Sequence, residues 1–208
     1  MPATPASPGD LELLEGWRDG DKKAGDELFV RHFESIYRFF AGKVDAEAVE
    51  DLVQNTFLAC VEGKDSFRGE ASFRTYLFAV ARRLLYRRYR DRHKTDRLDF
   101  GVTSLHDLGP SPTAAVHAKQ EQRLLLEALR RIPVDLQIAL ELHYWERLSG
   151  PDMAVALDIP EGTVRSRLRR AREALDAQLE ALADSAEILA ATTSDLDRWA
   201  ASLQRLFS

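Results

Sequence analysis

Cysteine is almost absent from this chain of 208 residues, and its scarcity excludes several kinds of protein. The single cysteine, Cys60, cannot form a disulfide or a cysteine-based zinc site within the chain. Its apolar neighbours Phe57, Leu58 and Val61 indicate a buried thiol in a helix rather than a reactive one.

Long apolar runs and a leader sequence are missing as well. No stretch reaches the roughly 18 apolar residues that span a membrane. The opening MPATPASPGD has neither a basic region nor an apolar core, so it does not resemble a signal peptide. These absences predict a cytoplasmic protein without membrane insertion.

The residue patterns of common enzymes are also missing. The five histidines show no HxxxH or other ligand spacing, and neither a Ser/His/Asp arrangement nor a phosphate loop is present. We therefore expect no enzymatic activity, no catalytic residues, no metal and no cofactor.

Charge is plentiful but unevenly distributed. The net charge is -5, yet the stretch from Arg74 to Arg97 carries +7 and the stretch from Glu161 to Arg172 carries +4. Two basic patches on an acidic body can bind a polyanion locally while the remainder repels it. Nucleic acid is therefore the partner that the charge pattern indicates.

Apolar periodicity predicts an all-α fold of two small helical domains joined by a flexible linker. Residues 10–97 form the first domain, in which an apolar stripe comprises Leu28, Phe29, Phe33, Ile36, Tyr37 and Phe40. Residues 98–113 lose the periodicity and gather glycine and proline, which predicts the linker. Residues 114–182 form the second domain, and residues 183–208 a helical extension.

The second domain contains a predicted helix-turn-helix. Ser149 and Asp152 fit the cap of a short helix whose Met153, Ala154 and Leu157 can pack on the next helix. That next helix carries an apolar stripe, and its start is rich in small residues and arginine. Such a helix enters the major groove of DNA, with its N-terminal residues on base edges and its arginines on phosphates or guanine. The apolar stripe comprises Val164, Leu168, Ala171 and Leu175.

At this point the motifs resemble a known family. The segments LSGPDMAVAL and IPEGTVRSRLRRARE resemble the C-terminal DNA-binding region of bacterial sigma factors of the extracytoplasmic-function group of the sigma-70 family. EDLVQNTFLAC and SFRGEASFRTYLFAVARRLL resemble the same group's core-binding and promoter-melting regions. The resemblance covers about residues 10–182, in the family's order. It implies a dissociable subunit that binds core RNA polymerase at its clamp and flap, recognises promoter DNA and aids melting, with an anti-sigma factor as a further partner.

The resemblance implies three groups of site residues. For core-polymerase binding they are Asp51, Leu52, Gln54, Asn55, Phe57 and Leu58; Asp51, Asn55 and Leu58 share one helix face, while Phe57 fits core packing equally well. For the −10 element they are Phe67, Arg68, Ser72, Phe73, Arg74, Tyr76, Arg82, Arg83, Arg87 and Arg88, with Tyr86 and Tyr89 interleaved as possible stacking rings. For the −35 element they are Thr163, Arg165, Ser166, Arg167, Arg169, Arg170 and Arg172.

Several points stay open at the level of sequence. Phe67 and Phe73 fit either base capture or anchoring of their loop. The chain departs from the family at Arg83, where asparagine is common, and at Gln137 and Ile138, where an arginine–glutamate pair is usual. The extension at 183–208 fits either a helix completing the second core or an autoregulatory helix. A polymerase-independent helix-turn-helix regulator remains the alternative function, although it has no need for the first domain's motifs.

Overall fold

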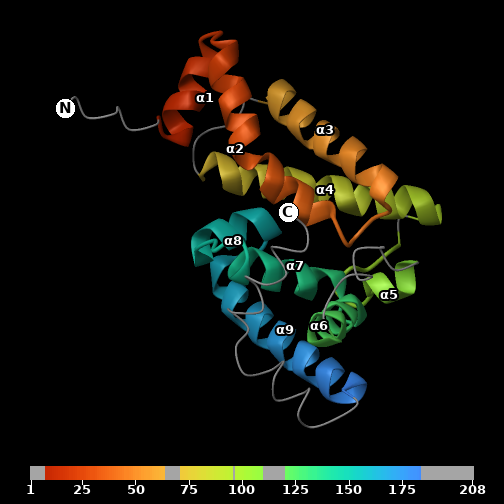
Figure 1. The fold of residues 1–208 in the computed structure, drawn as a ribbon. Helices are drawn as coiled ribbons and strands as arrows, with labels where there is room; N and C mark the ends of the chain where they lie inside the picture. The colour runs from red at the N-terminus through yellow and green to blue at the C-terminus, as the bar shows by residue number, and fades with distance from the viewer. Residues whose placement is uncertain (1–7, 64–70, 96, 110–119, 184–208) are drawn as a thin grey trace.

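All regular secondary structure in the described part of the chain is helical. A computed structural model describes residues 8–63, 71–95, 97–109 and 120–183, and within these ranges it contains helices α1 to α9 and no strand. Helices α1 to α4 form one half of the molecule, and α6 to α9 form the other half beneath α4 (Figure 1). None of the described helices is long and apolar enough to cross a bilayer. The all-α prediction is confirmed.

The N-terminal half consists of α1 (Asp10–Arg18), α2 (Lys22–Phe40), α3 (Ala46–Gly63) and α4 (Phe73–His93). Local sequence signals start and stop these helices. Asp21 caps α2 by accepting a hydrogen bond from the backbone N–H of Lys23, and Ser72 caps α4 by accepting one from Thr75. Helix α3 is described up to Gly63.

Helix α1 is held on α2 by a polar contact at its start. Asp10 accepts hydrogen bonds from Arg31 at 2.7 Å and from His32 Nε2 at 2.7 Å. Because His32 is buried, its charged form is disfavoured, and burial lowers the pKa of this imidazole although Asp10 opposes the shift. A neutral imidazole therefore supports the docking of α1.

The stripe predicted along α2 is correct except at one edge. Leu28, Ile36 and Phe40 are fully buried, but Phe33 is 51% exposed and stacks only on its helix neighbour Tyr37. Spacings of three and four define a stripe but not its width, so periodicity alone misplaces a residue at its border.

The predicted linker is partly built into the fold. Phe100 is buried and stacks on Tyr86 of α4 with ring centroids 4.0 Å apart. The short helix α5 (Leu105–Leu108) follows, capped by Ser104, and buries both of its leucines. Residues 97–109 thus connect the two halves as a packed strap, whereas residues 110–113 of the predicted linker lie outside the described residues.

The C-terminal half consists of α6 (Gln120–Arg131), α7 (Val134–Tyr144), α8 (Gly150–Leu157) and α9 (Glu161–Leu182). The predicted cap of α8 is confirmed, since Ser149 accepts a hydrogen bond from the backbone N–H of Asp152. Asp158 in the left-handed conformation, with φ 53°, ends α8, and a brief turn leads into α9. The extension at 183–208 lies outside the described residues beyond Ala183.

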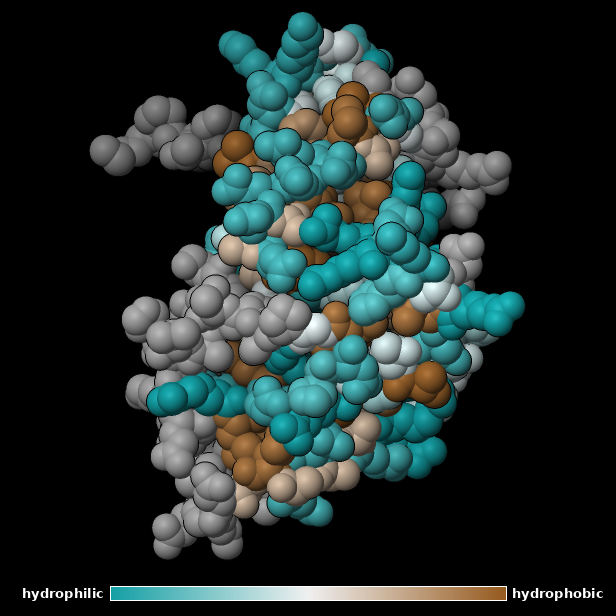
Figure 2. All heavy atoms as spheres, turned by 90° about the vertical axis from the view of Figure 1, so that its right-hand side faces the viewer, coloured by the Kyte–Doolittle hydropathy of each residue, from teal (hydrophilic) through white to brown (hydrophobic). Residues whose placement is uncertain are grey.

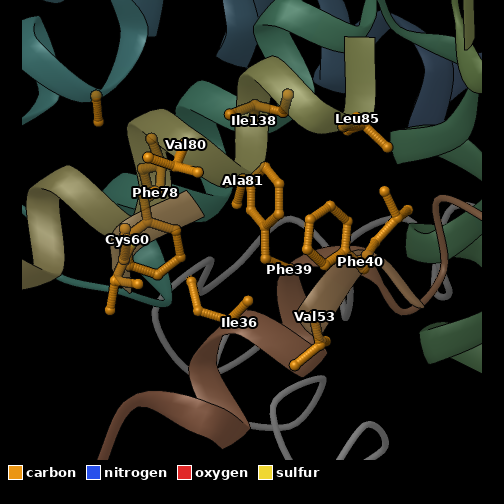
Figure 3. Close-up of a cluster of buried hydrophobic side chains, with 14 of the residues drawn as sticks. Ile36, Phe39, Phe40, Val53, Cys60, Phe78, Val80, Ala81, Leu85 and Ile138 are labelled. Atoms are coloured by element: carbon orange, nitrogen blue, oxygen red, sulfur yellow. The ribbon is translucent and has the colours of Figure 1, made fainter. Parts of the chain in front are cut away.

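Buried apolar side chains form two clusters in the described structure. One lies within the C-terminal half, between α6, α7 and α9. The other is continuous across both halves: Figure 3 shows Ile138 of α7 beside Val80 and Ala81 of α4, with Phe39 and Phe40 of α2 nearby. Its C-terminal members are Val134, Ile138, Ala139, Leu142, Leu148, Met153, Ala156, Leu157 and Val164. The halves therefore share a continuous apolar interface.

Cys60 lies in the N-terminal part of this shared cluster, with no exposed surface. Burial raises the pKa of its thiol to about 12, because an apolar surrounding disfavours the thiolate. The predicted burial of this thiol is confirmed.

Gly25 provides a test of packing at the α1–α2 contact. A Cβ added at Gly25 would lie 2.6 Å from two atoms of the Trp17 indole, which is itself buried. We expect Gly25→Ala to lower the free energy of unfolding by about 1–3 kcal/mol through overpacking. Gly162→Ala is the control, because a Cβ there meets nothing within 4 Å. Denaturant unfolding of both variants checks the prediction, and equal stability of the two would contradict it.

His32 predicts a pH dependence of stability. Its pKa is lowered in the folded state, whereas in the unfolded chain it titrates near 6.5. As the pH falls, the unfolded state therefore binds a proton before the folded state does. The free energy of unfolding should be highest above pH ~6.5 and should decrease as the pH falls through the folded pKa. His32→Gln keeps an N–H donor for Asp10 but cannot titrate, and it should flatten this slope. The exposed His93, changed to Gln, is the control, and an unaltered slope in His32→Gln would refute the assignment.

Candidate polymerase and DNA interfaces

An open groove runs between α3 and α4. It has a volume of about 740 Å³, and its walls combine apolar and charged side chains: Asp51, Leu52, Asn55, Leu58, Ala59, Glu62, Leu84, Arg87, Arg88, Asp91 and Arg92. Asp51, Asn55 and Leu58 are exposed on one face of α3, with Leu58 53% exposed. Figure 2 shows the side of the molecule on which α5 and the C-terminal end of α4 lie in Figure 1. This surface is largely hydrophilic, with hydrophobic atoms in separate patches.

The predicted polymerase-binding residues thus separate into two sets. Asp51, Gln54, Asn55 and Leu58 are exposed and available to a partner. Phe57 is 8% exposed, and its ring packs on Phe29 with centroids 4.8 Å apart, so the core-packing alternative is correct for Phe57. Leu52 is also buried, although it is one of the residues that line the groove.

The start of α4 contains the described part of the predicted −10 loop. Ser72 is exposed and serves as the N-cap, with its hydroxyl 2.8 Å from that of Thr75. Phe73 is buried beside His32, so it anchors the helix rather than facing a base. Phe67 and Arg68 lie outside the described residues.

The arginines of α4 differ in their surroundings. Arg83 and Arg87 are exposed, and Arg88 borders the groove. Arg74 instead pairs with the buried Glu146, whose backbone carbonyl also accepts its second N–H group at 2.6 Å. Arg82 lies over the Tyr86 ring at 4.6 Å, and its guanidinium is 3.5 Å from Asp135.

The tyrosines of α4 are not free to stack on bases. Tyr86 and Tyr89 are both buried, so the prediction of stacking rings is wrong for both in this arrangement. The Tyr86 hydroxyl donates to Asp135 and the Tyr89 hydroxyl donates to the backbone carbonyl of Lys43. Burial raises the pKa of both phenols, which keeps them neutral donors. Tyr76 is half-buried, and burial raises its pKa as well.

Helix α9 presents most of its predicted DNA-binding side chains to solvent. Arg165, Ser166, Arg169, Arg170 and Arg172 are exposed, and Thr163 is half-buried in the first turn. Arg169 pairs with Glu173 on its own helix, and Arg172 lies over the Tyr144 ring. Arg167 is the exception, because it turns inward to Asp135 at 3.4 Å.

Acidic partners across the interface were missed from the sequence. Glu141 of α7 pairs with Lys43, which follows α2, and both side chains are almost completely excluded from water. Gln137 supports Glu141 with a 2.8 Å hydrogen bond, so the unusual Gln137 and Ile138 have structural roles, Ile138 in the core. Glu141 lies within an apolar stretch of the sequence, and this position could have indicated a buried ion pair, because a buried carboxylate requires a partner.

The described residues contain no cluster of three side chains that could hold a metal ion. The distinctive features of these residues are binding surfaces. One face of α3 combines polar groups with an exposed leucine, and the exposed sides of α4 and α9 carry arginine. A polar and apolar helix face fits a protein partner, whereas separated basic helices fit a nucleic acid.

Comparison with known proteins agrees with this geometry. The family models for sigma-70 region 2 and sigma-70 region 4 match residues 28–95 and 122–175. The ECF RNA polymerase sigma-E factor of Haemophilus influenzae is 32% identical over 184 residues, which cover 83% of this chain and 96% of that protein. The RNA polymerase sigma-H factor of Pseudomonas aeruginosa is 33% identical, with 83% and 95% covered.

Solved structures share the fold. The structure of CnrH in complex with the cytosolic domain of CnrY matches with a TM-score of 0.53 and 23% identity, covering 85% of this chain and 99% of that one. The sigma factor RpoE in complex with the anti-sigma factor NepR from Bartonella quintana matches with a TM-score of 0.55 and 22% identity, covering 77% and 97%.

These findings define the class: an all-helical protein with the two regions of a sigma factor in their order along the chain. The chain belongs to the extracytoplasmic-function group of sigma-70 factors, and it directs promoter-specific transcription initiation with RNA polymerase. Sigma factors are initiation factors rather than enzymes.

Proposed function

We propose a division of this function between the two halves. Residues 10–97 bind the clamp of core polymerase and engage and melt the −10 element, and residues 114–182 read the −35 element and meet the flap. The packed strap at 97–109 joins them. The observation that carries this proposal is the presence of exposed arginines on two separate helices, α4 and α9, beside an exposed polar and apolar face on α3.

On α9, the exposed N-terminal half is the part that supports base readout. Arginine binds guanine or phosphate through its planar fork of donors, and Thr163 and Ser166 leave room for close approach of the groove. Ser166 donates to the carbonyl of Thr163 at 2.9 Å, so its hydroxyl causes no conflict within the helix. Arg165, Arg169 and Arg170 would contact DNA without any change in the helix.

On α3, Asp51, Gln54, Asn55 and Leu58 form the proposed contact with the polymerase. Their side chains are exposed although the helix is otherwise buried on its opposite face, which leaves a single face for a partner helix. A central leucine surrounded by polar groups is a common composition for a protein interface.

The same family properties suggest the setting in which the protein works. It would act in the cytoplasm and contribute no catalytic group of its own, since the polymerase supplies the chemistry. Two structural relatives are complexes with an anti-sigma factor or with the cytosolic domain of another protein, which supports an anti-sigma partner for this chain. A polymerase-independent regulator is not favoured, because both sigma regions are matched.

Replacing Arg165 or Arg169 with alanine should weaken promoter occupancy by the holoenzyme. Loss of one base or phosphate contact is expected to cost ~1–3 kcal/mol of binding free energy. Footprinting of the −35 region on promoter fragments measures the effect. Arg131→Ala is the matched control, since it removes an exposed arginine from α6 of the same half. Footprints that weaken equally in all three variants would contradict specific readout by α9.

Replacing Asp51 with alanine should weaken binding to core polymerase. The carboxylate is exposed at the groove, so its removal deletes a contact without disturbing the core of α3. We expect a loss of several-fold in affinity in a titration of labelled protein with core enzyme. Glu47→Ala, which removes an exposed acid from the first turn of the same helix, should retain the affinity. Unchanged affinity in Asp51→Ala would remove this residue from the interface.

A further inference from the structure

An arginine in the left-handed conformation precedes the helix-turn-helix. Among the described residues, three that are not glycine have positive φ: Lys94, Arg147 and Asp158. Lys94 and Asp158 are C-caps, which directly end α4 and α8. Arg147 instead lies in the turn between α7 and α8, with φ 52°. A left-handed backbone brings Cβ close to the following carbonyl oxygen, so glycine is the residue that occupies such a position without strain.

The residues on both sides hold this turn in place. Glu146 and Leu148 are buried, and the carboxylate of Glu146 pairs with Arg74. The backbone N–H of Glu146 donates to the carbonyl of Glu141 at 3.1 Å, and that of Leu148 donates to the carbonyl of Leu142 at 3.0 Å. These contacts impose the left-handed conformation on the residue between them.

The chain thus carries a long cation at a position that favours glycine. Arg147 is exposed, so packing in the core is not the reason for its presence. Strained backbone positions persist where the side chain they carry serves a function. An exposed arginine at such a position therefore points to a binding role for its guanidinium.

The place of this turn in the fold indicates which partner the guanidinium meets. In a helix-turn-helix the first helix crosses the DNA backbone while the second enters the major groove, and here these helices are α8 and α9. Their starts lie beside one another, since a Cβ added at Gly150 would be 4.0 Å from Glu161 Oε1, and α8 lies next to the first turns of α9 in Figure 1. Ser149, Gly150, Glu161 and Gly162 are all exposed. Arg147, three residues before Gly150, borders the surface that these two helix starts form.

We propose that Arg147 binds a phosphate of promoter DNA beside the −35 element. Phosphate oxygens accept the paired N–H groups of a guanidinium, and a contact of this kind fixes the register of a protein on the duplex without reading bases. The inference rests on the proposed reading of the −35 element by α9. It adds to that reading an anchor that acts on every promoter sequence equally.

Two substitutions separate the strain at position 147 from the charge that it carries. Arg147→Gly and Arg147→Ala both remove the cation, but only glycine relieves the left-handed backbone. Thermal unfolding of the full chain should therefore give a Tm that is higher for Arg147→Gly than for Arg147→Ala by about 2–4 °C. Both variants should lose the same amount of DNA affinity, so the loss cannot result from lower stability.

DNA affinity is measured with holoenzyme on a promoter fragment defined by its mapped RNA 5′ end, over a series of salt concentrations. Loss of one phosphate contact should lower the slope of log K against log[salt] by about 0.9, which corresponds to about eightfold weaker binding at ~0.1 M salt. The deficit should be the same on a fragment with a scrambled −35 element, because a phosphate contact does not depend on sequence.

Two further variants serve as controls. Arg147→Lys keeps the cation and should retain the salt slope of the parent. Arg131→Ala removes an exposed arginine from α6 of the same half and should leave both the affinity and the slope unchanged.

Unchanged affinity and slope in Arg147→Gly and Arg147→Ala would overturn the inference. So would a reduced slope in Arg147→Lys, a deficit confined to the fragment with an intact −35 element, or equal Tm values for the glycine and alanine variants. Arg165→Ala on the same fragments separates this inference from the proposed function. Weaker binding by Arg165→Ala but not by the Arg147 variants would remove the phosphate contact alone, whereas the reverse would support that contact and remove base readout by α9.

Discussion

One buried ion pair, between Lys43 and Glu141, lies at the contact between the two halves of the described structure. Each charge would be costly alone in an apolar surrounding, and removal of one partner from such a pair typically costs about 3–5 kcal/mol. Lys43 also donates to the carbonyl of Phe39, and Glu141 accepts from Gln137, so both charges are satisfied by hydrogen bonds. The pair links α7 to the chain that follows α2.

In this arrangement the basic side chains fall into two groups. Arginines that face α7 and α8 are paired with acids, and arginines that face outward remain open to solvent on α4 and α9. The groove between α3 and α4 lies on a different side and is open in the same arrangement. The groove therefore stays accessible while α7 and α8 cover another face of α4.

The sequence predicted what depends on near neighbours. The cap at Ser149 and the turn between α8 and α9 were readable, because each is set by a few adjacent residues. The exposed face of α3 was also predictable from spacing. Burial of Phe100 and the contacts of Asp135 were not, since both depend on partners in other helices. The tyrosines of α4 were misjudged for the same reason, because periodicity cannot tell which polar face a second domain will cover.

The most direct test of the account is transcription from genomic DNA fragments by purified core polymerase, with and without this protein, with mapping of new RNA 5′ ends. The account predicts new starts that share one pair of −35 and −10 elements and that disappear when the protein is omitted. An absence of new starts, from a protein that still binds both core enzyme and DNA, would contradict it.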